Sequence, residues 1–354
     1  MEDFVMMKRR GCFWSCMSIL VSAGLLLTAC GKGSHSSMSQ VSDTSEVSAK
    51  ESEQIAEISA IAGEGSNVYV WTVYWDMDHA FRTIYNCSKE ISSVGIFAAY
   101  YTNDGKLKFS DDASALGSRL SYAKKTQKVP RYLTVVNDTE KEQKSLALTR
   151  RLLKDERSIN SAVSDIVQMA TDQQCSGVEI DFEKLREDIP LWNQFIRFEN
   201  QLIQECRHKS LQVRIILETA TPVDQIQLPE GPQYVVMCYN LYGYGTGPGP
   251  KADLAFLKKT VRKFEALRSV DFAIADGGFD FNQSGEVTAV TYQDAENKRS
   301  EFKKKSKRDP KSAALYFQYG SHTVWYADDE TLRQWTLALQ AASGRKVSIS
   351  LWRI

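Results

Sequence analysis

The sequence predicts an α/β fold, a (β/α)8 TIM barrel with a small α+β insertion between the seventh strand and the last helix. Three observations predict it. From residue 68 onward, short apolar and aromatic runs alternate with longer amphipathic stretches, as expected of a parallel sheet. Residues 68–354 hold eight such runs, which fits one barrel. Polar or aromatic residues stand at the ends of the runs, where reactive groups collect in such barrels.

The eight expected strands are apolar runs separated by turn residues or amphipathic stretches. They are 68–75, 94–101, 131–137, 176–183, 211–219, 234–240, 270–275 and 346–352. An open doubly wound sheet is the alternative, but it would not bring the first and last strands together. In a closed barrel we expect the residues at the strand ends to converge on a ligand: Tyr74, Trp75, Tyr100, Asn137, Glu183, Glu218, Asn240 and Trp352.

The fourth expected strand carries the strongest chemical signal. Within Gly177–Glu183, apolar residues alternate with Glu179, Asp181 and Glu183, so the three carboxylates point the same way. On an exposed sheet this would be an ordinary solvated face. Long amphipathic stretches on both sides instead favour a βαβ unit whose helices cover the apolar face, which turns the acids inward.

Closely spaced inward carboxylates repel one another, and this repulsion raises the pKa of at least one of them. A carboxyl group that stays protonated near neutrality can act as a general acid. The strand therefore predicts a site for acid catalysis.

These residues carry a resemblance. Ser176–Glu183 resembles the D-G-x-D-x-D-x-E strand of glycoside hydrolase family 18, the chitinase and endo-N-acetylglucosaminidase family, with Ser176 and Glu179 replacing the first two Asp residues. Met237–Gly243 resembles the family's M-x-Y-[DN] motif, and Val347–Trp352 its closing strand. The family's Ser-x-Gly-Gly after the third strand is absent, and Val135–Asp138 stands in its place.

The resemblance implies roles for these residues. Glu183 would be the general acid, and the substrate's own 2-acetamido oxygen would be the nucleophile. Asp181 would orient that group, and Glu179 would hydrogen-bond or share a proton with Asp181. Tyr239 and Asn240 would bind the same group, with Met237 beside them and Trp352 as the floor under the sugar.

The implied substrate is a β-linked N-acetylglucosamine glycan: chitin-like, peptidoglycan or N-glycan. No metal or cofactor is called for. Two other functions stay open. One is a lectin-like surface protein without catalysis, although the retention of both Asp181 and Glu183 argues against it. The other is a solute-binding lipoprotein, which usually has two α/β lobes.

The N-terminal part predicts export and anchoring. Residues 1–29 hold a basic cluster followed by an apolar run, as in a secretory signal. Leu27–Cys30 resembles a bacterial lipobox, so we expect a lipid on Cys30 that holds the protein at the extracytoplasmic face of the cell membrane. An uncleaved anchor or an ordinary signal peptide is the alternative. Residues 30–67 are expected to form a flexible tether.

The charge balance and the cysteines limit the classes of partner and site that the chain can be expected to have. The chain has 44 basic and 44 acidic residues, so no net charge favours nucleic acid. Beyond residue 30, four cysteines lie without metal-like spacing and are expected to be buried thiols, although a disulfide stays possible. The insertion is expected at about 280–326, with strands at 285–292 and 314–319 around a basic helix at 294–307.

Overall fold

The computed structural model describes residues 53–60 and 68–354. The expected signal segment, Cys30 and most of the expected tether lie outside these residues. No helix within the described ranges is long and apolar enough to cross a membrane.

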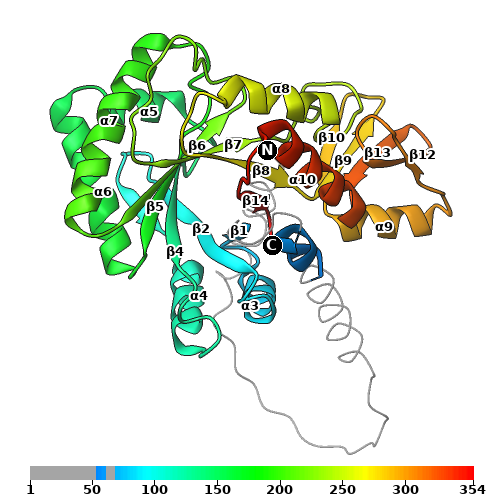
Figure 1. Cartoon of the computed structure of the whole chain (residues 1–354), viewed down its shortest axis with the longest axis horizontal. Helices are drawn as coiled ribbons and strands as arrows, with labels where there is room; N and C mark the ends of the chain where they lie inside the picture. Colours follow the sequence, from blue (N-terminus) through cyan, green and yellow to red (C-terminus); the bar gives the residue numbers. More distant parts are fainter. Residues whose placement is uncertain (1–52, 61–67) are drawn as a thin grey trace, which may run out of the picture. The chain divides into compact units, whose positions relative to one another are not determined.

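Eight parallel strands close into a barrel, because β1 (Val68–Val73) pairs with both β2 (Ile91–Tyr101) and β14 (Ile349–Trp352). Each expected strand is present, and the predicted barrel is confirmed (Figure 1). The short β3 (Leu107–Phe109) adds an antiparallel partner to β2. The other barrel strands are β4 (Arg131–Thr139), β5 (Gly177–Asp181), β6 (Gln212–Glu218), β7 (Gln233–Met237) and β8 (Val270–Ala275).

Most strands are followed by a helix. The helices are α3 (Met77–Asn86), α4 (Asp111–Tyr122), α5 (Leu146–Leu152), α6 (Glu156–Asp172), α7 (Ile189–His208), α8 (Leu254–Phe264) and α10 (Asp329–Ser343). The long stretch expected before β5 is two helices, because Asp155 caps the start of α6 through the backbone nitrogen of Ser158. The link 219–232 between β6 and β7 has no helix.

The insertion begins earlier than expected, directly after β8. It is a five-stranded antiparallel sheet in the order β10-β9-β13-β12-β11 with one helix, seen in yellow and orange in Figure 1. Gly277 makes the turn from β8 possible, because its φ is +58° and an added Cβ would lie 2.4 Å from the Val290 carbonyl oxygen. The elements are β9 (Gly277–Asn282), β10 (Val287–Val290), α9 (Tyr292–Glu301), β11 (Lys307–Arg308), β12 (Leu315–Tyr319) and β13 (His322–Ala327).

Residues 53–60 differ from the expected tether. They form a helix in which Ile55 and Ile58 are buried in the main core. The Gln54 side-chain amide also donates a hydrogen bond to Asp329 at 2.6 Å. Two isoleucines three positions apart give a helix one apolar stripe, which is enough to dock it against α10. The four described cysteines are buried thiols.

A buried ion pair fills the inside of the barrel. Glu179 on β5 is fully buried and accepts hydrogen bonds from Trp71 Nε1 at 2.5 Å and Thr134 Oγ1 at 2.8 Å. Its other oxygen accepts from Arg214 Nε at 2.9 Å, across paired positions of β5 and β6. The Arg214 guanidinium lies 3.6 Å above the Tyr69 ring and donates to Ser350. Each charge is therefore balanced and hydrogen-bonded, which burial requires.

We expect Arg214→Met to destabilise the fold by about 3 to 5 kcal/mol, because Glu179 is left as a buried charge without its counter-charge. Glu179→Leu combined with Arg214→Met should recover most of that loss. Urea unfolding followed by circular dichroism measures both effects, and Arg262→Met on the exposed face of α8 is the matched control. Equal stability of the single and double variants would show that the pair is not coupled.

A second buried acid lies outside the barrel, between α7 and β7. Glu199 is fully buried, and its Oε1 has no hydrogen-bond partner, while the Tyr234 hydroxyl donates to Oε2 at a long 3.4 Å. Burial raises the pKa of Glu199 to about 8. In the unfolded chain the pKa of Glu199 is near 4.5. Between pH 4.5 and 8 the folded protein therefore holds a proton on Glu199 that the unfolded chain has already released.

Stability should fall as pH rises from about 4.5 through 8, because the raised pKa favours folding only while Glu199 keeps its proton. Glu199→Gln should remove this loss and stabilise the protein by about 2 to 4 kcal/mol at pH 8.5, with little effect at pH 4.5. Urea unfolding at the two pH values tests it. Glu205→Gln on the same helix is the control, and a pH-independent effect of Glu199→Gln would contradict this account.

Candidate active site

The strand β5 presents its acids to the inside because its other face is packed. Val178 and Ile180 are fully buried in the core between strands and helices. Phe182 stacks on Phe198 of α7, with 5.9 Å between ring centroids. This packing fixes the register that turns Glu179, Asp181 and Glu183 to the opposite side, in line with the alternation of the sequence.

Glu183 lies just beyond the end of β5, and Asn137 holds its backbone. The Asn137 side chain accepts from the Glu183 backbone nitrogen at 3.1 Å and donates to its carbonyl oxygen at 3.0 Å. The same amide donates to Thr149 Oγ1 at 2.9 Å. Asn137 is fully buried, so it stands behind the acid and positions it, whereas the sequence led us to expect a ligand contact.

Lys144 joins the two acids at the end of β5. Its ammonium lies 2.8 Å from Asp181 Oδ2 and 2.6 Å from Glu183 Oε1, and the lysine side chain is only 17% exposed. Although burial alone would lower it, the carboxylates of Asp181 and Glu183 raise the pKa of Lys144. The ammonium therefore stays charged and holds Asp181 and Glu183 side by side.

The two carboxylate oxygens of Asp181 differ in their partners. Oδ2 pairs with Lys144, while Oδ1 is buried and has no hydrogen-bond partner. Burial, opposed by Lys144 and reinforced by Glu183, raises the pKa of Asp181 to about 7. The expected hydrogen bond between Glu179 and Asp181 is absent among the described residues, because Trp71, Thr134 and Arg214 occupy the Glu179 carboxylate. That expectation is wrong: Glu179 anchors the barrel interior.

Aromatic side chains line the space beside the two acids. Trp352 makes edge contacts with Trp71 and Phe97, with ring centroids 5.9 and 5.2 Å apart. Lys144 Nζ lies 5.6 Å from the Phe97 ring centroid. Tyr239 packs in the same cluster with Met237, and burial together with Asp181 and Glu183 raises its pKa. The Tyr239 hydroxyl therefore stays protonated near the acids and can donate a hydrogen bond.

The remaining expected residues lie around this rim. Tyr74 contacts Trp75 edge-on at 4.8 Å, and burial with nearby Tyr100 and Asp138 raises the pKa of Tyr74 to about 12. Asn240 is exposed, with a left-handed φ of 59°, and no hydrogen bond of its side chain is seen within the described residues. Trp75 contacts Phe97 edge-on, with 6.3 Å between ring centroids, and so lies next to the aromatic residues beside the acids. The convergence of Tyr100 and Asn240 with them stays a prediction.

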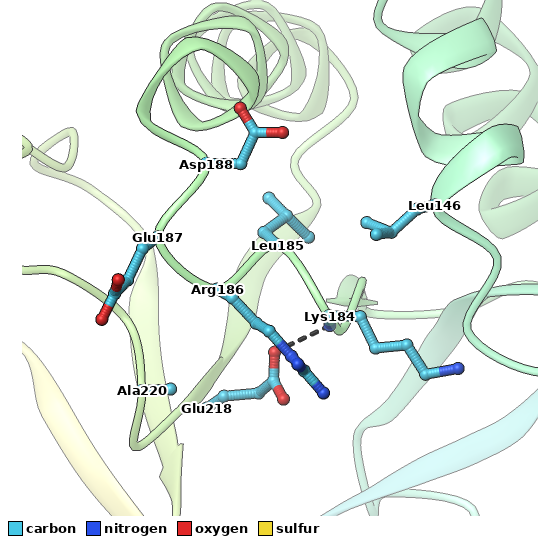
Figure 2. A pocket seen from close by; sticks show the side chains of 8 residues that line it. All are labelled: Leu146, Lys184, Leu185, Arg186, Glu187, Asp188, Glu218 and Ala220. Carbon is cyan, nitrogen blue, oxygen red and sulfur yellow. Dashed lines mark hydrogen bonds between the residues drawn. The ribbon is translucent and has the colours of Figure 1, made fainter.

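A cavity of about 760 Å³ lies at the loop that follows β5 (Figure 2). The loop 184–188 after β5 lines it together with Leu146, Glu218 and Ala220. Glu218 Oε2 accepts from the Lys184 backbone nitrogen at 2.7 Å, the dashed contact in Figure 2. Burial and the charge of Glu183 raise the pKa of Glu218. Most of the residues that line the cavity therefore follow Glu183 directly in the sequence.

Three site residues escaped the sequence analysis. Arg214 could have been found, because a single arginine at an inward position of an apolar strand requires an acidic partner. Trp71 also stands at an inward position, although aromatic residues in strands are common. Lys144 lies in a loop with no pattern that marks it. Within residues 53–60 and 68–354, no group of three or more His, Cys, Asp or Glu side chains could hold a metal ion.

Known proteins resemble this chain in structure but not in sequence. No protein-family model matches the sequence, and no curated protein matches it. Among solved structures, a chitinase from Chromobacterium violaceum is similar with a TM-score of 0.70 and 19% identity, covering 82% of this chain and 94% of that one.

Two further structures extend the comparison. The spore cortex-lytic enzyme SleL from Bacillus cereus has a TM-score of 0.67 and 17% identity, covering 82% of this chain and 71% of that one. A mutant class V chitinase from Nicotiana tobaccum, solved in complex with NAG4, has a TM-score of 0.67 and 13% identity, covering 81% and 94%. At these identities the likeness establishes the fold: this chain has the same barrel fold as these chitinases and this cortex-lytic enzyme.

Proposed function

We propose that the protein is a glycoside hydrolase that cleaves β-linked N-acetylglucosamine-containing glycans by a substrate-assisted retaining mechanism. One observation carries the proposal. Asp181 and Glu183 stand side by side at the carboxyl end of the barrel, beside an aromatic wall that includes Trp352. A paired acid and carboxylate next to an aromatic surface suits a pyranose ring, whose C–H face packs on aromatic groups.

In the first step Glu183 donates a proton to the glycosidic oxygen, and the bond from that oxygen to the anomeric carbon breaks. The carbonyl oxygen of the substrate's 2-acetamido group attacks the same carbon and forms a cyclic oxazolinium ion. Asp181 Oδ1 has no hydrogen-bond partner among the described residues, so its acceptor capacity is left for the acetamido N–H, and the charge of Asp181 stabilises the cation. The Tyr239 hydroxyl donates to the acetamido oxygen.

In the second step a water molecule attacks the anomeric carbon. Glu183, now a carboxylate, takes a proton from that water, and the oxazolinium ring opens with overall retention of configuration. Because Asn137 fixes the backbone of Glu183 on both sides, the carboxyl group can serve both steps from one position.

Glu183→Gln should lower turnover by about 10²- to 10⁴-fold while glycan binding persists, because the amide cannot donate an acidic proton. The test is mass spectrometry of products from chitin oligomers, peptidoglycan strands and an N-linked glycopeptide. Glu301→Gln, on the exposed insertion helix α9, is the control. Full activity of Glu183→Gln would contradict the mechanism, and binding without cleavage by the unaltered protein would indicate a lectin-like function instead.

We also infer that the protein is anchored through a lipid on Cys30 at the extracytoplasmic face of the membrane, a proposal supported by the sequence of residues 1–30 alone. In a bacterial host the full chain should incorporate labelled palmitate and partition into detergent. Cys30→Ala should not incorporate the label, because it lacks the thiol that takes the lipid. Labelling that survives in Cys30→Ala would contradict the assignment.

A further inference from the structure

The contact between Lys144 and Glu183 conflicts with the proposed chemistry. In the ion pair Glu183 is a carboxylate, and its Oε1 faces the ammonium at 2.6 Å. A general acid must instead hold a proton and present it to the glycosidic oxygen. The arrangement in which Lys144 pairs with Glu183 is therefore not the one that reacts.

The backbone of Lys144 is fixed, so only its side chain can move. Its nitrogen donates to Asp138 Oδ1 at 2.8 Å, and the next residue, Ser145, caps helix α5 through the Leu148 nitrogen. Lys144 itself has a left-handed φ of 53°. Beyond this backbone, the four-carbon side chain has several rotatable bonds, and it reaches across from the β4–α5 loop to the end of β5.

The position of the ammonium indicates what replaces it. It lies between two carboxylates and 5.6 Å from the centroid of the Phe97 ring, which in turn contacts Trp352. The proposed reaction forms its cation next to the same two carboxylates. The charged groups that face it are Asp138, Asp181 and Glu183, with Glu218 beyond them. The ammonium thus occupies the site of the positive charge that develops on the sugar.

On the basis of the proposed function, we propose that Lys144 is a positioning residue: its ammonium pairs with Asp181 and Glu183 together, and an entering glycan displaces it from Glu183. Glu183 then takes a proton from the solvent, and Lys144 becomes hydrated.

The first test needs no glycan. The carboxyl ¹³C signal of Asp181, assigned by its loss in Asp181→Asn, should titrate near pH 7 in the native protein. In Lys144→Met the midpoint should rise by about one pH unit or more, because the ammonium favours the ionised form. Lys144→Arg should restore it, and Lys141→Met in the same loop should leave it unchanged. An unchanged midpoint in Lys144→Met overturns the proposal.

The second test uses chitotetraose as the probe. Lys144→Met should lower KM about three- to tenfold, because the glycan no longer breaks an ion pair to enter. A raised KM would mean that Lys144 stays in place and binds the glycan, which overturns the displacement. If the midpoint of Asp181 shifts as expected but no glycan in the panel is bound or cleaved, the proposed function fails while the pairing of Lys144 with the acids stands.

Discussion

Glu179 and Asp181 are buried on one face of β5, and Glu183 follows just beyond its end, so the three carboxylates can lie close together only if counter-charges balance them. The fold provides two. Arg214 on β6 holds Glu179 in the barrel interior, and Lys144 from the β4–α5 loop holds Asp181 and Glu183 at the rim. Without them, repulsion in a region of low dielectric would oppose the packing of β5 that every neighbouring strand depends on. The register of the barrel and the geometry of the site therefore rest on the same charge balance.

The two counter-charges differ in how firmly they are held. Arg214 is buried, stacked on Tyr69 and bonded to Ser350, so the Glu179 pair has no route to exchange with water. Lys144 reaches its partners through a long, partly exposed side chain. One pair thus belongs to the fixed interior, while the other lies where a ligand can compete for it. This division explains how a strand can be rigid at its centre and reactive at its end.

The sequence predicted much of this arrangement because the spacing of its apolar residues follows from which side chains the fold buries. Alternation at Gly177–Glu183 indicated which side chains face inward, and eight apolar runs indicated closure of the barrel. The fixed partners were harder to predict. Asn137 was expected at the rim, yet its amide matches the backbone of Glu183 and is buried against it. No pattern in the sequence around Lys144 indicates a site residue, because only the folded loop brings this lysine to β5. Residues 53–60 were misjudged because two isoleucines suffice for docking.

The most direct measurement is a crystal structure of the native protein with a thio-linked N-acetylglucosamine tetramer, which binds but resists cleavage. The account predicts one sugar beside Trp352, its acetamido N–H on Asp181 Oδ1, the linking sulfur facing Glu183, and the Lys144 ammonium withdrawn from Glu183. A tetramer bound elsewhere on the barrel, with the Lys144 bridge intact, would contradict it.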